Sequence, residues 1–413
     1  MIQNPATIVY DGRGKEVFPA ASRDAFGRFR VSNPANVFDS KQLFDSQPLF
    51  FAESTASGGS TTHSSNRAST LLETDGTSGS QAIRQTRRYF NYQPGKSLRI
   101  FATFVGGAND ANTRKRVGYF DANNGIFFQN NGGTLAMVRR SFVTGAAVDE
   151  VVTSGSWNVD SFDGTGPSGI TLDATKAQIF VVDLEWLGVG VVRTGFVIDG
   201  YLYYAHEFKH SNIIDSVYMS SPNLPVRWEI ESLSATVASS LEAVCCSVES
   251  EGGADPVAAV RSVNRGTNDE EIGTTIEPLL SIRLKAAYNR AAVQVDRISV
   301  MSTGGANARW ELAYLPAGGT GAISGGGGPS WVGVDNSAVE YDLTANSISG
   351  DYYVLRSGYF ANNQDSIYAE INSAVTLAAD IAGTTRDIIC LLASVVSGGG
   401  EDFLGAIDYK ELL

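Results

Sequence analysis

Between residues 191 and 208 the chain reads VVRTGFVIDGYLYYAHEF. Two runs rich in β-branched and aromatic residues flank the dipeptide Asp199-Gly200 in this stretch. Asp and Gly both accept the positive φ angles that two-residue hairpin turns require. The stretch therefore predicts two antiparallel strands, at 191–198 and 201–208, joined by a type I′ turn.

Short strands and turns recur on both sides of this hairpin. Before it, Asn124-Gly125 between two aromatic runs marks a second hairpin, and further strands are expected at 98–105 and 178–186. After it, strand patterns occupy 279–284, 293–301, 309–314, 352–360 and 387–396. Many short strands with few helical patterns predict an all-β fold of two antiparallel β-sandwich domains, jelly-roll or lectin-like, preceded by an extended N-terminal arm.

Shifts in composition suggest where the domains begin and end. Residues 1–80 lack clear periodicity, and 53–80 are dominated by Ser, Thr, Gly and Ala, which is too polar to form a core alone. We expect an extended arm and polar segment at 1–80, a first lectin-like sandwich at 81–250, a linker at 251–275 and a second sandwich at 276–413.

Composition excludes several classes of protein. The 413 residues are 43% hydrophobic and 18% charged, with a net charge of −13. That apolar content rules out global disorder, and the acidic balance argues against nucleic acid as a partner. The longest apolar stretch, 388–396, is far short of the ~20 residues that span a bilayer. The N-terminus lacks the charged and apolar regions of a signal peptide. We therefore expect that the protein assembles in a cytoplasm and does not insert into a membrane.

The cysteines support the same expectation. The chain has three cysteines, of which Cys245 and Cys246 are adjacent and Cys390 is distant. Any one disulfide among them would leave one cysteine over. Adjacent cysteines pair only under strain, so three free thiols in a reducing compartment are expected.

Two patterns carry letters associated with catalysis. The zinc-protease pattern is matched by His206, Glu207 and His210, but that pattern binds zinc only on a helix. Here the residues end a predicted strand. Positions four apart on a strand lie ~13 Å apart, which is too far for both histidines to bind one metal ion. Asp183 and Glu185 alternate with apolar residues, which places both on one sheet face, as in glycoside hydrolases. The same spacing is common on solvated sheet faces. Exposed strand-end histidines and a hydrated or inter-subunit sheet face remain the simpler interpretations.

Three basic clusters and one turn have structural explanations. The clusters are Arg84/Arg87/Arg88, Arg114/Lys115/Arg116 and Arg139/Arg140. In an acidic protein we expect them to pair with local carboxylates or across a subunit interface. The stretch 121–125 resembles a calcium loop but lacks the alternation of ligands, so we expect a turn.

Several runs are similar to a family of tailed-bacteriophage virion structural proteins. They are DAFGRFRVSNP at 24–34, FDSKQL at 38–43, NYQPGKS at 91–97, GYFD at 118–121, NGIFF at 124–128, DGTGPSGI at 163–170 and EWLGVG at 185–190. The resemblance covers mainly residues 20–235, with a looser echo at 278–285. The hairpin at 196–201 is also similar to concanavalin-like lectin sandwiches, an analogy of fold alone.

The resemblance implies a non-enzymatic structural component of the virion, assembled in the host cytoplasm. It implies an oligomeric tail or neck appendage or a fibre-type protein, with a trimer as one form and other virion proteins as partners. It brings no catalytic motif, cofactor or metal. We expect the arm to dock the protein to the particle through Phe26, Arg28, Phe29 and Arg30.

Three other functions stay open at this stage. The protein could be a head decoration or cement protein, or an adhesin that binds glycans on the host surface. It could also be an enzyme that uses the carboxylates or the histidines named above. An adhesin predicts exposed Tyr or Trp side chains gathered at one end of a sandwich.

Overall fold

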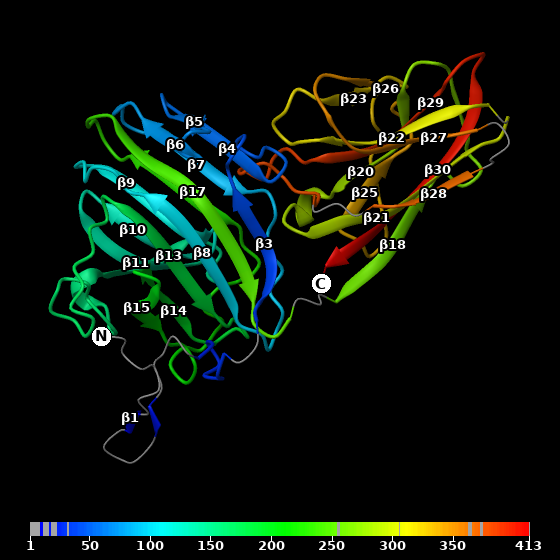
Figure 1. The fold of residues 1–413 in the computed structure, drawn as a ribbon. Coiled ribbons are helices and arrows are strands. Elements are labelled where there is room, and N and C mark those ends of the chain that lie inside the picture. The colour runs from blue at the N-terminus through cyan, green and yellow to red at the C-terminus, as the bar shows by residue number, and fades with distance from the viewer. Residues whose placement is uncertain are drawn as a thin grey trace. The chain divides into compact units, whose positions relative to one another are not determined.

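A computed structural model describes residues 9–10, 16–17, 23–30, 33–253, 257–304, 306–361, 366–371 and 375–412. The chain forms two compact units (Figure 1). Unit 1 comprises Met1–Thr86 and Tyr92–Asp255, and unit 2 comprises Arg87–Asn91 and Pro256–Leu413. Strand pairing within the sheets is antiparallel throughout the described residues, so the predicted all-β class is confirmed. No helix in the described residues is long and apolar enough to cross a membrane.

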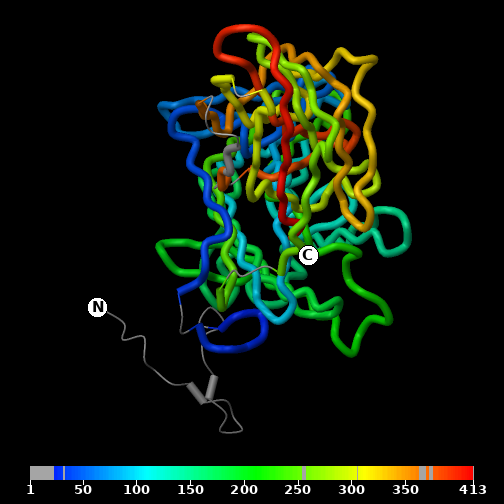
Figure 2. The backbone as a smooth tube through the Cα atoms, turned by 90° about the vertical axis from the view of Figure 1, so that its right-hand side faces the viewer, coloured from blue at the N-terminus to red at the C-terminus, as the bar shows by residue number. Residues whose placement is uncertain are grey.

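Unit 1 is a sandwich of two sheets. The first sheet contains, in spatial order, β12 (Val148–Thr153), β11 (Thr134–Ser141), β10 (Gly125–Asn131), β9 (Thr113–Phe120), β16 (Val226–Ser232), β7 (Gln81–Thr86) and β4 (Phe51–Ala56). The second contains β15 (Tyr201–Phe208), β14 (Val192–Ile198), β13 (Ala177–Leu184), β8 (Leu98–Val105), β17 (Ser239–Ser250), β6 (Ser69–Thr74) and β5 (Ser60–Ser64). A further strand, β3 (Ala35–Lys41), pairs with β17, and Figure 2 shows it in blue beside the green β17.

Aromatic side chains fill the space between these two sheets. The ring of Phe128 on β10 lies 5.3 Å from Phe196 and 5.8 Å from Phe104, which belong to the other sheet. The indole Nε1 of buried Trp228 donates to the carbonyl oxygen of Thr103 across the sandwich, at 3.2 Å. Alternating strand residues therefore supply one core face per sheet, as strand periodicity requires.

Both predicted hairpins form, but their turns differ. Asp199 (φ 52°) and Gly200 (φ 82°) form the two-residue turn between β14 and β15. Between β9 and β10 the turn is Asp121–Asn124 instead, and Gly125 pairs with Phe120 inside the ladder. The Asp121 carboxylate accepts the backbone N–H of Asn123 and Asn124 at 2.6 and 2.8 Å, which closes the longer turn.

The expected boundaries of the arm and of the linker were wrong. Strands β3 to β7 lie between residues 35 and 86, inside the sandwich of unit 1. The polar stretch can join a core because its buried hydroxyls have partners, as in the 2.5 Å bond from Thr70 to Gln42. Within 251–275, β18 (Ala258–Asn264) and β19 (Glu270–Ile272) pair with β30 (Glu401–Leu412) of unit 2. Strands β3 and β6 pair with β17 and β7 pairs with β16, all more than 100 residues away along the chain, which local composition cannot reveal.

Unit 2 is a second sandwich. One sheet has the order β18-β30-β21-β28, with β21 at Ala292–Ser302 and β28 at Ser366–Glu370, and β19 pairs with the far end of β30. Figure 2 shows β18 beside the red β30. The other sheet runs β24 (Val332–Gly333), β25 (Val339–Asp342), β20 (Glu277–Leu284), β29 (Ile388–Val395), β22 (Ala308–Leu315) and β27 (Tyr353–Phe360).

A small second core lies on β22 and β29. Ala313, Leu315, Cys390 and Leu392 pack there with Ile323 and Ala345. Ile323 lies on the short strand β23 (Ala322–Ser324), which pairs with β26 (Ser347–Ser349). The glycine-rich stretch between β22 and β24 is thus anchored to the sheet by its apolar residues. The remaining short elements are β1 (Val9–Tyr10) with β2 (Glu16–Val17) and the 3₁₀ turns Ser154–Ser156 and Ala286–Tyr288.

Gly195 gives a test of the β14–β15 register. It lies at an irregularity of that ladder, and an added Cβ would approach the Tyr203 carbonyl oxygen to 2.0 Å and the Tyr204 Cα to 2.7 Å. Since both atoms belong to the backbone, Gly195→Ala should lower the free energy of unfolding by ~2–3 kcal/mol in urea titrations. Gly155→Ala is the control, because nothing lies within 4 Å of that Cβ. Equal stabilities of the two variants would refute this register.

Candidate functional site

Asp183 on β13 is fully buried and accepts four hydrogen bonds. Its Oδ2 receives Arg30 Nη2 at 2.7 Å, Arg193 Nη2 at 2.9 Å and the hydroxyl of Tyr204 at 2.5 Å. Its Oδ1 receives the hydroxyl of Ser97 at 2.8 Å. We call these five residues the Asp183 cluster. Burial raises the pKa of Tyr204, so its hydroxyl stays protonated and donates.

Strand register brings the cluster together. Asp183 is directly opposite Arg193 on β14 and Arg99 on β8. Alternation turns Asp183 away from the core face that Val182 and Leu184 supply. The other face of the second sheet thus carries the charges.

The charges around the cluster balance. Arg30 also forms an ion pair with Glu251, and Arg99 pairs with Glu249 at 2.6 Å and with Glu251 at 3.6 Å. With Arg193 and Asp183, this region holds three guanidinium groups and three carboxylates. A buried carboxylate costs several kcal/mol unless it is paired in this way.

Two of the stretches that resemble the bacteriophage family, 24–34 and 91–97, meet at this cluster, and a third, 185–190, packs against the second of them. Asp24 accepts the backbone N–H and the Nε of Arg28 at 2.8 and 2.7 Å, which closes the turn before Arg30. Arg28 Nη1 donates to the carbonyl of Gly95 at 3.3 Å, and Ala25 N donates to Ser97 at 3.4 Å. The third stretch joins through the rings of Tyr92 and Trp186, 6.4 Å apart. Residues distant in sequence thus form one structural feature.

The four predicted docking residues have different environments. Arg30 is held inside the Asp183 cluster, so its side chain is engaged by its own unit. Phe26 is partly buried beneath the guanidinium of Arg28, 4.7 Å from the ring centroid. The Arg28 side chain is 54% exposed and Phe29 is 47% exposed. Only these last two present substantial surface to a partner.

The predicted pair of carboxylates does not form a catalytic dyad. β13 ends at Leu184, so Glu185 lies in the following turn, where its Oε1 accepts Val191 N at 3.1 Å. Burial raises the pKa of Glu185, but Asp183 is already saturated by its four donors. The two side chains serve separate structural roles.

The histidines were expected to be exposed strand-end residues, and the expected exposure was wrong, because His206 on β15 is 7% exposed and His210, just after β15, is 2% exposed. His206 lies on β15 and accepts Asn158 N on its Nδ1 at 3.3 Å. His210 stacks on Tyr218, with ring centroids 4.1 Å apart, and its Nδ1 lies 2.5 Å from the carbonyl oxygen of Gly190. Burial lowers the pKa of both imidazoles, which are therefore neutral at pH 7. Within the described residues, no group of three or more His, Cys, Asp or Glu is arranged to hold a metal ion.

The basic clusters pair locally, as predicted. The ion pairs are Arg84–Glu53, Arg114–Glu231, Arg116–Glu229, Arg139–Glu150 and Arg140–Asp149. Burial of Arg116 lowers its pKa to about 10. These pairs leave no broad basic surface on the sheet for a polyanion. The three cysteines are free, and burial raises the pKa of the Cys390 thiol to about 12.

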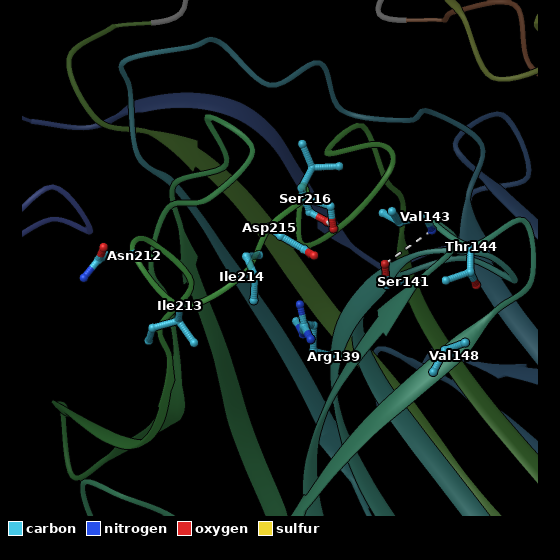
Figure 3. Close-up of a pocket in the computed structure, with 11 residues that line it drawn as sticks. Arg139, Ser141, Val143, Thr144, Val148, Asn212, Ile213, Ile214, Asp215 and Ser216 are labelled. Carbon is cyan, nitrogen blue, oxygen red and sulfur yellow. Dashed lines mark hydrogen bonds between the residues drawn. The ribbon is translucent and has the colours of Figure 1, made fainter.

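A groove beside β11 and β12 is the second candidate site. A cavity of about 760 Å³ lies between the turn after β11 and the loop 212–217 (Figure 3). Arg139 lies between its walls, with Ile214 and Asp215 on one side and Thr144 and Val148 on the other (Figure 3). A second cavity of about 320 Å³ shares Arg139, Ile213 and Ile214 with the first and reaches His206 and His210. We call the two cavities together the β11–β12 groove.

Sequence reasoning missed this groove as a site. Arg139 was noted as basic, and the histidines as a metal pattern, but nothing linked them. Its walls come from residues 139–158 and 206–217, which only the folded sheet brings together.

No family model and no curated protein matches the sequence. Solved structures are similar over about half of the chain. They include the carbohydrate recognition domain of Emp47p (11% identity, 53% of this chain and 97% of that chain, TM-score 0.31). A legume lectin-like domain from Entamoeba histolytica has 7% identity over 52% and 98% of the two chains, with a TM-score of 0.32. A family 16 endo-glucanase from Bacteroides ovatus has 7% identity over 51% and 99%, with a TM-score of 0.34.

One expectation needs correction here. The chain was expected to be non-enzymatic, and the glycoside hydrolases among these similar structures contradict that expectation. We therefore do not retain it. At such TM-scores the likeness itself carries no argument for a reaction in this chain.

The Asp183 cluster predicts a large effect of one substitution. Arg30→Ala leaves the buried Asp183 without its N-terminal partner and should lower the free energy of unfolding by ~3–5 kcal/mol in urea titrations. Arg28→Ala removes a more exposed ion pair of the same turn and should cost ~1 kcal/mol or less. Similar losses in both variants would contradict a central role for Arg30.

Histidine burial predicts a pH dependence of stability. Because the folded pKa of His206 and of His210 is lowered, the unfolded chain binds more protons below pH ~6.5. The stability is fully present above that pH and falls as the pH drops toward the folded pKa values. The melting temperature should therefore decline between about pH 6.5 and 5, above the range where carboxylates titrate. His210→Phe should reduce the slope, and an unchanged slope in that variant would refute this assignment.

Proposed function

We propose that the chain is a structural component of a bacteriophage particle, attached to its neighbours through the N-terminal part of unit 1. The observation that carries the proposal is that the stretches 24–34 and 91–97 meet at the Asp183 cluster, while 185–190 packs against 91–97 through the rings of Trp186 and Tyr92. These stretches carry the family resemblance. Their meeting gives a physical reason for several of their residue types, because Arg30 and Ser97 donate to Asp183 and the ring of Trp186 packs near that of Tyr92.

The cluster suits a rigid attachment. Arg30 ties the turn 23–30 to Asp183 on β13 and to Glu251 after β17. Whatever binds that turn is therefore connected to a sheet rather than to a free tether. A fixed attachment of this kind costs little further conformational entropy on assembly.

The docking surface is smaller than the sequence suggested. We assign it to the exposed faces of Arg28 and Phe29, whereas Arg30 positions the turn that presents them. The partners proposed are other virion proteins and further copies of this chain. The position proposed is a tail or neck appendage, with the head exterior as the alternative that imaging of intact particles decides.

Adhesion to a host-surface glycan is a second candidate function. The β11–β12 groove favours it, since its lining mixes hydroxyl, amide and carboxylate groups with exposed aliphatic side chains. The expected cluster of exposed aromatic residues is not part of this lining. Any glycan bound there would be held by polar and aliphatic contacts.

Phe29→Ser tests the docking surface. The variant should fold normally, because the side chain is 47% exposed, and should enter particles at least about tenfold less than the parent chain, equivalent to ~1.4 kcal/mol. Incorporation can be measured by immunoblot of purified particles after complementation of a phage that lacks the gene. Phe44→Ser is the matched control, since Phe44 is 91% exposed elsewhere in unit 1. Equal incorporation of both variants would overturn the assignment.

A further inference from the structure

His210 has an unused hydrogen-bonding atom at the smaller cavity of the β11–β12 groove. The residue is 2% exposed, and its Nε2 has no hydrogen-bond partner among the described residues. Its Nδ1 lies against the carbonyl oxygen of Gly190, which fixes the proton of the neutral ring on Nδ1. Nε2 is therefore an acceptor that is left without a partner in a buried position, which is unfavourable.

His206 offers the opposite group. Its Nδ1 accepts the backbone N–H of Asn158, so the proton of the neutral ring is on Nε2. Both imidazoles border the smaller cavity, and one ring carries an acceptor nitrogen while the other carries a donor nitrogen. Hydroxyl groups satisfy both, because each can donate and accept.

The charges of the groove argue against an anionic ligand. Arg139 is neutralised by Glu150 at 2.6 Å, and its Nη1 also donates to the carbonyl of Tyr218 at 3.3 Å. Lys209 pairs with Glu207 at 3.3 Å. Asp215 adds one more negative charge to the larger cavity. A phosphate or a carboxylate would meet this surplus of negative charge without a free cation among the described lining residues.

Aliphatic side chains supply the remaining contacts. Ile213 is 69% exposed and belongs to both cavities, and Val143 and Val148 are exposed in the larger one. Such groups can pack against the C–H faces of a sugar ring while the polar groups bind its hydroxyls. The two cavities adjoin, because they share lining residues, and together they have room for more than one sugar ring.

We propose that the β11–β12 groove binds a neutral glycan, with one ring placed between His206 and His210 and the next over Ile213. This inference rests on the adhesin candidate above, and it adds the position of the site and the class of ligand. Arg139 orients the floor of the groove through its bonds to Glu150 and Tyr218.

A glycan array probed with the full-length protein gives the first test. Neutral oligosaccharides should bind, and sialylated or phosphorylated ones should not. Each neutral ligand found is then titrated against protein carrying ¹⁵N-labelled histidine. The chain has only three histidines, so each imidazole is observable separately. His206 and His210 signals should move, whereas His63, bonded to Gln42 on another part of the sheet, should stay.

Two variants locate the site. His210→Phe keeps the ring stacked on Tyr218 but removes both nitrogens, and it should weaken binding at least about tenfold, equivalent to ~1.4 kcal/mol. Ile213→Asp changes an exposed side chain, so it should weaken binding without a change in the melting temperature. His63→Phe is the matched control and should bind normally.

The outcomes separate the site from the function. Neutral-glycan binding that both groove variants leave unchanged would overturn this site while leaving the adhesin candidate standing. Binding of acidic glycans alone would overturn the proposed ligand class. Absence of binding across the array would overturn both the site and the adhesin candidate, whereas the particle-incorporation experiment would be unaffected.

Discussion

The buried carboxylate of Asp183 is the interaction on which the geometry of unit 1 depends. Its four donors come from the N-terminal turn, from the start of β8, from β14 and from β15. A charge in this position is tolerated only while its partners stay in place. The turn around Arg30 is therefore part of the fold, and the residues before it are attached at a fixed point of the sheet.

Unit 2 also contains a buried carboxylate, but its partners are of a different kind. Asp387 is fully buried there and accepts the Tyr314 hydroxyl at 2.8 Å and the backbone N–H groups of Ala317 and Ala378 at 2.7 and 2.9 Å. Arg87 lies farther away, at 3.5 Å. Burial raises the pKa of Asp387, because backbone donors and one distant cation compensate desolvation only in part. Asp387 thus holds the backbone at Ala317 and Ala378 in place, whereas Asp183 holds the turn that contains Arg30.

The sequence predicted the features that local patterns determine and missed those that depend on contacts between distant residues. The strands 98–105 and 201–208 were correct to the residue, because alternation and turn chemistry are local signals. The strands between 35 and 86 were missed, since polar side chains there are satisfied by partners distant in sequence. Asp183 was noticed only as a neighbour of Glu185. Its true partners are separated from it by up to 153 positions, and no spacing rule connects them.

The two candidate sites differ in how completely their hydrogen-bonding capacity is used. Both oxygens of Asp183 have donors, so this carboxylate has no oxygen left for a ligand, and its role is to hold the fold. At the β11–β12 groove, the buried Nε2 of His210 has no hydrogen-bond partner among the described residues, and this side chain borders the smaller cavity. Native folds rarely leave a buried acceptor unused without a reason. Saturation therefore marks the first site as structural, and its absence marks the second as a place for a ligand.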